Sequence, residues 1–300
     1  MQLLPDVNCG IAAISPIIGC SSGCKYCYLP LKGFSLPYPN GITETQLIEY
    51  LLCHPRFLRG REGTFLCIGV WGEMFPSDQD ICAVSLSWLR ALSTLNNPIA
   101  IITKGAIAEE TVRQIAELQN YNRNIALLET ITTLRLHALL EPNTAEPYGR
   151  FQTMDLCQRY GLHTAALINP FISEISDPDY EDILMKLEEI KVANVIISPL
   201  YVNGTICKRL SGIPQLQDII KKYLCGYLHD ANHLKDEAYE VSAVEKLEER
   251  TDLLATANKH NVQLWHHYSC YLSNIHQRRN LFRIDNPLIC IRCGNCEQYK

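Results

Sequence analysis

Six short apolar runs alternate with segments of helical periodicity over the first two thirds of the chain. The runs are apolar on both faces, which is typical of buried parallel strands, and they cover residues 11–17, 64–71, 98–103, 124–131, 163–169 and 193–200. The helical segments between them cover residues 44–57, 81–95, 108–119, 146–161 and 177–191. Such alternation predicts right-handed β-α-β units around a parallel sheet. Six units are too few for a closed eight-stranded barrel. The sequence therefore predicts an α/β fold, a partial (β/α)6 barrel within residues 1–205.

The alternation ends near residue 205, and residues 206–300 are predicted to form a helical, cysteine-rich C-terminal extension. Residues 236–260 show the periodicity of one long amphipathic helix. A basic stretch, HQRRNLFR, follows at residues 276–283, and three closely spaced cysteines lie beyond it. We therefore predict two domains, the barrel and this extension.

Charge and hydropathy limit the partners that the chain can have. The net charge is -5 over 300 residues, which gives no general attraction to nucleic acid, because phosphate binding needs clustered Lys and Arg. The first 18 residues lack a basic start and are interrupted by Pro5, Asp6 and Pro16, so no secretory signal is predicted. No apolar run is long enough to span a bilayer. We expect a cytoplasmic protein without a membrane partner, in which thiols stay reduced.

The chain has 14 cysteines, which in a reducing compartment indicates metal binding or catalysis rather than disulfides. Cys20, Cys24 and Cys27 lie within eight residues, in GCSSGCKYCY, directly after the first predicted strand. Loops at the carboxyl ends of parallel strands form active sites in α/β folds. A structural zinc site usually takes four protein ligands. Three thiolates on one loop favour an iron–sulfur cluster with one open iron, and a zinc half-site or chance is the alternative.

GCSSGCKYCY resembles the signature of the radical S-adenosylmethionine (SAM) enzymes, Cys-x3-Cys-x-aromatic-Cys, with Tyr26 at the aromatic position. The resemblance implies a [4Fe–4S] cluster on Cys20, Cys24 and Cys27 whose open iron binds SAM. It also implies reductive cleavage of SAM to methionine and a 5′-deoxyadenosyl radical, which abstracts hydrogen from a substrate. An external electron donor, a flavodoxin or ferredoxin, would supply the electron. The family's fold is the six-stranded partial barrel predicted above.

The resemblance covers about 190 residues and places SAM contacts at the ends of later strands. Gly72 and Glu73, in GVWGEMFPSD, lie where the family has a Gly-Gly-Glu motif that holds the SAM amino group, although Trp71 replaces the first glycine. Lys104, in ITKGAI, is placed to pair with the SAM carboxylate. The alternatives are a solvated loop carboxylate for Glu73 and an ordinary strand-end lysine for Lys104.

Residues 127–150 resemble the fourth-strand region of the subgroup that includes spore photoproduct lyase. Glu129, Thr130 and Thr132 are candidates there for contacts with the SAM ribose or carboxylate. The alternatives are that Glu129 is the partner of a buried arginine and that the threonines are ordinary strand residues. Glu141, Pro142 and Arg150 match positions typical of the subgroup, and the resemblance assigns them no role.

A second group of cysteines marks the C-terminal extension. Cys290, Cys293 and Cys296 supply three thiolates, and Cys270 is the candidate fourth ligand. Four cysteinates fill the sites of a second iron–sulfur cluster. Zinc bound by four cysteines is the structural alternative, and an inert tail is the other. Auxiliary clusters are common in radical SAM enzymes, which favours iron–sulfur.

Three functions remain open at this point. The first is modification of a ribosomally made precursor peptide, because auxiliary clusters recur in such enzymes and the acidic balance suits a peptide better than DNA. A small separate partner would recognise the peptide, since Cys20 leaves no room for an N-terminal recognition domain; spliceases, which excise tyramine, are of this type. The second is repair of a nucleic-acid lesion, as in spore photoproduct lyase, which the basic residues 276–283 favour. The third is a non-catalytic iron–sulfur or zinc protein that binds a partner.

Overall fold

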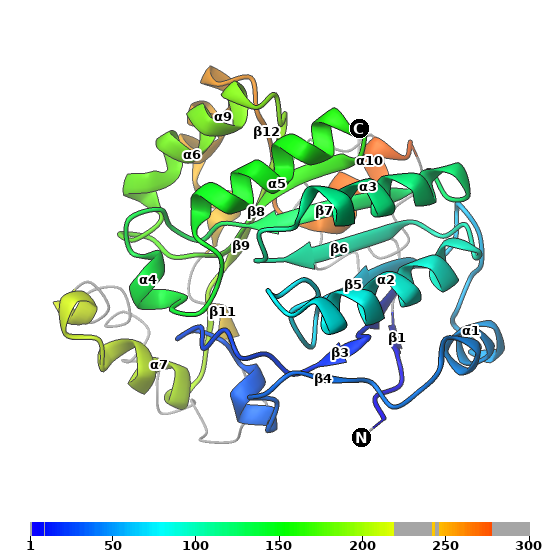
Figure 1. Cartoon of the computed structure of the whole chain (residues 1–300). Helices are drawn as coiled ribbons and strands as arrows, with labels where there is room; N and C mark the ends of the chain where they lie inside the picture. The colour runs from blue at the N-terminus through cyan, green and yellow to red at the C-terminus, as the bar shows by residue number, and fades with distance from the viewer. Residues whose placement is uncertain (1, 9, 219–241, 244–245, 278–300) are drawn as a thin grey trace.

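The computed structural model describes residues 2–8, 10–218, 242–243 and 246–277. Its centre is one eight-stranded sheet in the order β1-β2-β5-β6-β7-β8-β9-β12 (Figure 1). The strands are β1 (Asp6–Asn8), β2 (Ile11–Ile14), β5 (Phe65–Ile68), β6 (Ile99–Thr103), β7 (Ile125–Thr130), β8 (His163–Phe171), β9 (Asn194–Pro199) and β12 (Gln263–Trp265). All neighbours pair in parallel except β1, which is antiparallel to β2. Six of these strands are the predicted ones, and the predicted fold class is confirmed.

Helices connect consecutive strands and cover the outer face of the sheet (Figure 1). The larger ones are α1 (Glu44–Cys53), α2 (Gln79–Ser93), α3 (Glu109–Glu117), α5 (Pro147–Arg159), α6 (Asp177–Glu189) and α9 (Thr251–Lys259). Local sequence fixes their starts: Thr43 and Gln46 form a capping box at the start of α1, and the Asp78 side chain accepts hydrogen bonds from the first turn of α2.

Smaller elements complete the described part of the chain. The short helices are α4 (His137–Leu140), α7 (Gly204–Ser211) and α10 (Tyr268–Ile275), with 3-10 turns η1 (Leu29–Lys32), η2 (Leu118–Asn120), η3 (Pro214–Leu216) and η5 (Leu247–Glu249). Two small antiparallel ribbons pair β3 (Ile17–Ile18) with β4 (Tyr38–Pro39) and β10 (Tyr201–Val202) with β11 (Ser242–Ala243).

Apolar side chains pack on both faces of the sheet, because successive strand residues point to opposite faces. On the outer face, Leu127 and its neighbours belong to a buried cluster shared with α1, α2 and α3. On the inner face, Leu128 belongs to a cluster with Trp265 and Tyr271, from β12 and α10. Helix α10 therefore fills part of the barrel interior. Its end lies near the amino ends of the strands, where the His276 and His163 rings are 5.6 Å apart.

One predicted helix differs from the structure. The long helix predicted over residues 236–260 is wrong in its described part, where only Thr251–Lys259 is α-helical. The backbone leaves the helical region at Arg250 (φ -82°, ψ 82°), whose side chain is held by Asp177 at 2.7 Å and by Asp252. Residues 236–241 lie outside the described ranges.

Beyond residue 205, the chain contributes β12 to the barrel sheet, parallel to β9. The domain division at residue 205 stays a prediction, although part of the predicted extension is built into the sheet. No helix in the described ranges is both long and apolar enough to cross a bilayer.

Candidate active site

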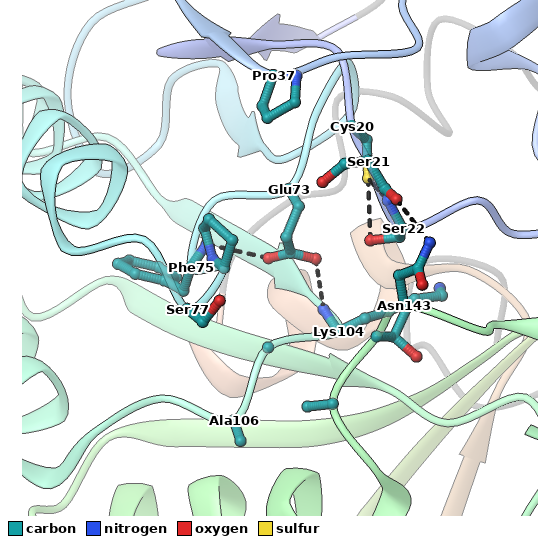
Figure 2. A pocket seen from close by; sticks show the side chains of 14 residues that line it. Cys20, Ser21, Ser22, Pro37, Glu73, Phe75, Ser77, Lys104, Ala106 and Asn143 are labelled. Atoms are coloured by element: carbon teal, nitrogen blue, oxygen red, sulfur yellow. Dashed lines mark hydrogen bonds between the residues drawn. The ribbon is translucent and has the colours of Figure 1, made fainter. Parts of the chain in front are cut away.

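A cavity of about 310 Å³ opens at the carboxyl ends of β2, β5 and β6, between the cysteine loop (residues 19–28) and the segment that leads into α5. Cys20, Glu73, Lys104 and Asn143 line it together with neighbouring residues. Figure 2 shows these side chains arriving at one place from separate strand ends. This is the arrangement that the sequence analysis expected, because the carboxyl ends of parallel strands share an edge.

Two glycines bring the cysteine loop against the end of β5. The Gly19 backbone N–H donates to the Trp71 carbonyl oxygen at 2.7 Å, and Gly19 forms a parallel bridge with Gly72. A Cβ at Gly72 would lie 2.5 Å from the Ile17 carbonyl oxygen, so only glycine allows this approach. Gly72 thus has a structural role: it sets the distance between the cysteine loop and Glu73, the next residue.

The three cysteines lie on this loop in a mainly buried setting. Cys24 is 8% exposed, and Cys20 and Cys27 are half-buried. Backbone N–H groups of Ser22 and Leu29 donate to the sulfurs of Cys20 and Cys27, each at 3.4 Å. Such donors stabilise thiolates and tune cluster potentials. Burial raises the pKa of the Cys24 thiol to about 12, against the opposing effect of Lys104, so a metal would have to displace its proton.

The donor set fits a three-ligand iron–sulfur cluster, in which each thiolate binds a different iron. Three thiolates lie on one loop, with backbone N–H donors directed at the sulfurs of Cys20 and Cys27. Cluster ligation by Cys20, Cys24 and Cys27 stays a prediction that these residues support.

Glu73 is a fixed carboxylate at the cavity wall. It accepts hydrogen bonds from the backbone N–H groups of Phe75 (3.0 Å) and Lys104 (2.9 Å) and from the Thr103 hydroxyl. Figure 2 shows the two N–H donors on either side of its carboxylate group. A carboxylate has about four acceptor positions, so Glu73 can accept from a further donor in the cavity, such as an ammonium group.

Lys104 follows β6 directly and points toward the cysteine loop. Its Nζ lies 3.9 Å from Glu141 Oε1 and 5.8 Å from the centre of the Tyr26 ring. Its side chain is 18% exposed where it lines the cavity. The predicted anion-binding lysine is therefore next to the predicted cluster loop, at a site an anion can reach.

Tyr26 and Thr132 meet behind the cavity wall. The Tyr26 hydroxyl donates to Glu141 Oε1 and lies 3.2 Å from Thr132 Oγ1. Burial, the Glu141 charge and the proximity of Cys24 raise the pKa of Tyr26 well above its ordinary value, so the phenol stays protonated. Thr132 is fully buried, and its hydroxyl lies within hydrogen-bond distance of both the Tyr26 hydroxyl and, at 3.4 Å, the Asn169 carbonyl oxygen.

Glu129 and Thr130 are neighbours on β7 but differ in their contacts. Thr130 is buried, and its carbonyl oxygen accepts from Arg150 Nη1 at 2.8 Å. Glu129 is fully buried, and neither carboxylate oxygen has a hydrogen-bond partner among the described residues. Burial raises the pKa of Glu129 well above its ordinary range, and the Arg150 charge opposes the shift only in part.

Of the predicted site residues in the described ranges, the structure brings three to the cavity surface: Cys20, Glu73 and Lys104. The cavity lining does not include Cys24, Tyr26, Cys27, Gly72, Glu129, Thr130 or Thr132. Cluster ligation by Cys24 and Cys27 and the SAM contacts predicted for Tyr26, Gly72, Glu129, Thr130 and Thr132 stay predictions.

Sequence reasoning gave no role to the buried pair Glu141–Arg150. Both side chains have no exposed surface, and Arg150 Nη1 lies 2.7 Å from Glu141 Oε2. Burial acts to raise the pKa of Glu141, but Lys104, Arg150 and hydrogen bonds hold it below its ordinary value. The spacing of Glu141 and Arg150 was visible in the sequence, yet their pairing depends on how the loop before α5 folds. Arg209, from α7, was also missed; it donates to the Cys27 carbonyl oxygen at 2.5 Å.

The second cysteine group lies almost entirely outside the described residues. Cys290, Cys293 and Cys296 are beyond residue 277. Cys270 lies on α10, is 6% exposed, and belongs to the apolar cluster that fills the barrel interior. The second cluster, including Cys270 as a ligand, stays a prediction.

Comparisons with known proteins find similarity in structure. No family model matches the chain, and no curated protein matches its sequence. Spore photoproduct lyase complexed with dinucleoside spore photoproduct matches with a TM-score of 0.59 and 15% identity, over 84% of this chain and 75% of the lyase. A lyase variant with bound AdoMet and the same photoproduct matches equally well. SuiB from Streptococcus suis, bound to precursor peptide SuiA, matches with a TM-score of 0.50 and 11% identity, over 88% of this chain and 50% of SuiB.

Identities this low show the fold. The chain has the α/β fold of spore photoproduct lyase and SuiB, which are radical SAM enzymes. The resemblance drawn from GCSSGCKYCY and the later strand ends is thereby confirmed at the level of fold.

Proposed function

We propose that this chain is a radical SAM enzyme in which Cys20, Cys24 and Cys27 hold a [4Fe–4S] cluster and the adjoining cavity binds SAM. One observation carries the proposal: a cysteine of the signature, an anchored carboxylate and a lysine meet at one cavity from three strand ends. The fold is that of a lyase of which a variant was solved with bound AdoMet.

The chain's own residues bind and orient in this proposal. Glu73, held by two backbone N–H groups, accepts hydrogen bonds from the SAM ammonium group. Lys104 pairs with the SAM carboxylate. When bound, cluster and SAM together supply a 5′-deoxyadenosyl radical that removes a hydrogen atom from the substrate. The cavity walls limit access of water, so that this reactive species meets the substrate first.

For the substrate, we favour a ribosomally made precursor peptide. The net charge of -5 disfavours a nucleic-acid backbone, and SuiB, which shares the fold, was solved with a precursor peptide. Excision of tyramine, with help from a small peptide-recognition partner, is the specific reaction that we propose to test first. A flavodoxin or ferredoxin would donate the electron, and a second iron–sulfur cluster would lie in the C-terminal part.

A nucleic-acid lesion is the second candidate substrate. The observation that favours it is the higher structural similarity to spore photoproduct lyase in complex with its dinucleoside photoproduct, a TM-score of 0.59 against 0.50 for SuiB.

The first experiment is anaerobic reconstitution with iron and sulfide, reduction by dithionite with SAM, and detection of 5′-deoxyadenosine by mass spectrometry. Cys24→Ala should abolish its formation, whereas Cys53→Ala changes an exposed cysteine on α1 and serves as the matched control. Equal activity of the two variants would refute the assigned cluster site. If wild-type protein carries the cluster but forms no product with any substrate, the non-catalytic alternative is favoured.

The substrate test compares candidate peptides with photoproduct-containing oligonucleotides. The true substrate should stimulate 5′-deoxyadenosine formation and yield a product of changed mass. Stimulation by the oligonucleotide alone would reject the peptide proposal.

A further inference from the structure

Residues 140–145, from the last residue of α4 toward α5, run along the cysteine loop and are hydrogen-bonded to it through backbone and side-chain atoms. The Lys25 N–H donates to the Leu140 carbonyl oxygen at 2.9 Å. The Asn143 backbone N–H donates to the Ser22 carbonyl oxygen at 3.2 Å, and Asn143 Nδ2 donates to the Ser21 carbonyl oxygen at 3.1 Å. Asn143 is seen beside the loop in Figure 2. The geometry of the loop therefore depends on this segment.

Glu141 lies at the centre of this contact with its side chain fully buried. Its Oε1 atom accepts a hydrogen bond from the Tyr26 hydroxyl and lies 3.9 Å from Lys104 Nζ. Its Oε2 atom accepts from Arg150 Nη1 at 2.7 Å. One carboxylate thus connects the cysteine loop, the cavity lysine and helix α5.

Arg150 makes this connection rigid. Besides Glu141, it donates to the carbonyl oxygens of Thr130 and Ala145, both at 2.8 Å, and to the Thr144 hydroxyl at 2.5 Å. A guanidinium held at four acceptors has one orientation available. The carboxylate paired with it is fixed in the same way.

Lys104 is held less tightly than Arg150. A separation of 3.9 Å from Glu141 is longer than a hydrogen bond, and the lysine reaches the cavity surface. An anion in the cavity can attract Lys104 without leaving Glu141 unpaired, because Arg150 remains bound to it. Lys104 therefore offers a positive charge to the cavity, while the pair formed by Glu141 and Arg150 stays in place behind it.

We propose that Glu141 is a positioning residue with two tasks. Through Tyr26, it fixes the part of the loop between Cys24 and Cys27. Through its long-range pairing with Lys104, it directs a cation toward the carboxylate of SAM. This inference rests on the proposed function, because both tasks concern the cluster and SAM.

The first task is tested with Tyr26→Phe, which removes only the hydroxyl that binds Glu141. The matched control is Tyr180→Phe on α6, which removes a buried hydroxyl that donates to the Leu253 carbonyl oxygen at 3.2 Å. Both reconstituted variants are melted and are exposed to an anaerobic iron chelator. Similar melting temperatures are expected, with iron released roughly tenfold faster from Tyr26→Phe, the ratio that loss of one hydrogen bond gives.

The second task is tested with Glu141→Gln, which keeps the shape and removes the charge. Asp179→Asn is the matched control, since Asp179 is also fully buried and paired with an arginine, Arg135. SAM binding is measured by equilibrium dialysis without reductant, so that no turnover is needed. We expect the Kd to rise roughly tenfold in Glu141→Gln and to stay near the wild-type value in the control. The EPR signal of the reduced cluster should also change only in Glu141→Gln.

The outcomes separate the two proposals. Wild-type protein that binds no four-iron cluster refutes the proposed function before any variant is compared. Wild-type protein that loads the cluster, with iron release and SAM affinity in both site variants equal to their controls, overturns the role of Glu141. If Glu141→Gln does not fold, Tyr26→Phe decides the first task alone, and an unchanged Kd for SAM in Lys104→Met would overturn the second.

Discussion

Gly72 gives a sharp test of how the cysteine loop is placed. A Cβ there would lie 2.5 Å from the Ile17 carbonyl oxygen and 2.8 Å from the Gly19 carbonyl oxygen. Both are backbone atoms, so Gly72→Ala must push the exits of the first two barrel strands apart. Overpacking of this kind costs about 1–3 kcal/mol, and each kcal/mol lowers the Tm of a large domain by roughly 2–4 °C.

The same displacement moves Glu73, so activity should fall more than stability. A shift of about 1 Å in a positioning group can cost on the order of a hundredfold in rate. Gly212→Ala, at the end of α7, is the control, because its Cβ would meet the Lys208 carbonyl oxygen at 3.3 Å, a tight contact without the overlap found at Gly72. Thermal melting and 5′-deoxyadenosine formation are measured on both. If Gly72→Ala and Gly212→Ala have the same melting temperature and Gly72→Ala cleaves SAM at the wild-type rate, the close contact at Gly72 does not determine the position of the cysteine loop.

Three further predictions concern buried and cavity charges. Arg150→Met leaves Glu141 buried without its main partner, so the free energy of unfolding in urea should fall by about 3–5 kcal/mol; an unchanged midpoint would contradict the pairing. Lys104→Met should raise the Kd for SAM roughly 10- to 100-fold in equilibrium dialysis, with little change in melting temperature. The pKa of Asp179 is lowered: burial acts to raise it, but hydrogen bonds, including one from Thr133, outweigh burial. Its stabilisation is therefore present above about pH 4 and is lost as the pH falls through the folded-state pKa. In Asp179→Asn, the free energy of unfolding should fall less steeply below about pH 4 than in the wild type. Curves of unfolding free energy against pH that run parallel for the two proteins would contradict this prediction.

The barrel strands were predictable because their signal is local. A strand covered on both faces is apolar throughout, and residues 98–103 and 124–131 were expected where the structure has Ile99–Thr103 and Ile125–Thr130. Strand β12 has three residues and pairs in the sheet with β9, about 70 positions earlier. A run that short carries too little periodicity to be recognised, and its partner cannot be identified locally.

The same distinction holds for the site. Cys20, Glu73 and Lys104 were expected to converge, because each follows a strand of one parallel sheet, and they line one cavity. The contact of Tyr26 with Glu141 joins residues 115 positions apart. It depends on the path of the loop before α5, which strand order does not determine. Sequence reasoning therefore found the groups at the cavity surface and missed the buried support behind them.

The position of Glu129 could have been predicted more closely from the alternation of side chains along a strand. It shares one face of β7 with Leu127, which packs against the outer helices, whereas Thr130 is on the opposite face. Its proximity to Cys157 on α5, whose pKa is raised by burial and by the Glu129 charge, agrees with this placement. Glu129 and Thr130 were both predicted to contact SAM, although the alternation of side chains along β7 places them on opposite faces of the sheet.

The burial of Glu129 leads to a last prediction. Because burial raises its pKa well above the ordinary value, folding favours the protonated form of Glu129, and Arg150 pairs directly with Glu141 instead. A carboxyl whose pKa is raised on folding lowers stability as the pH rises above its unfolded-state pKa, about 4.3. Glu129→Gln removes this term, so the unfolding free energy of the variant relative to wild type should increase from pH 4 to pH 7. A difference that does not change with pH would mean that Glu129 is ionised and that Arg150 serves two carboxylates.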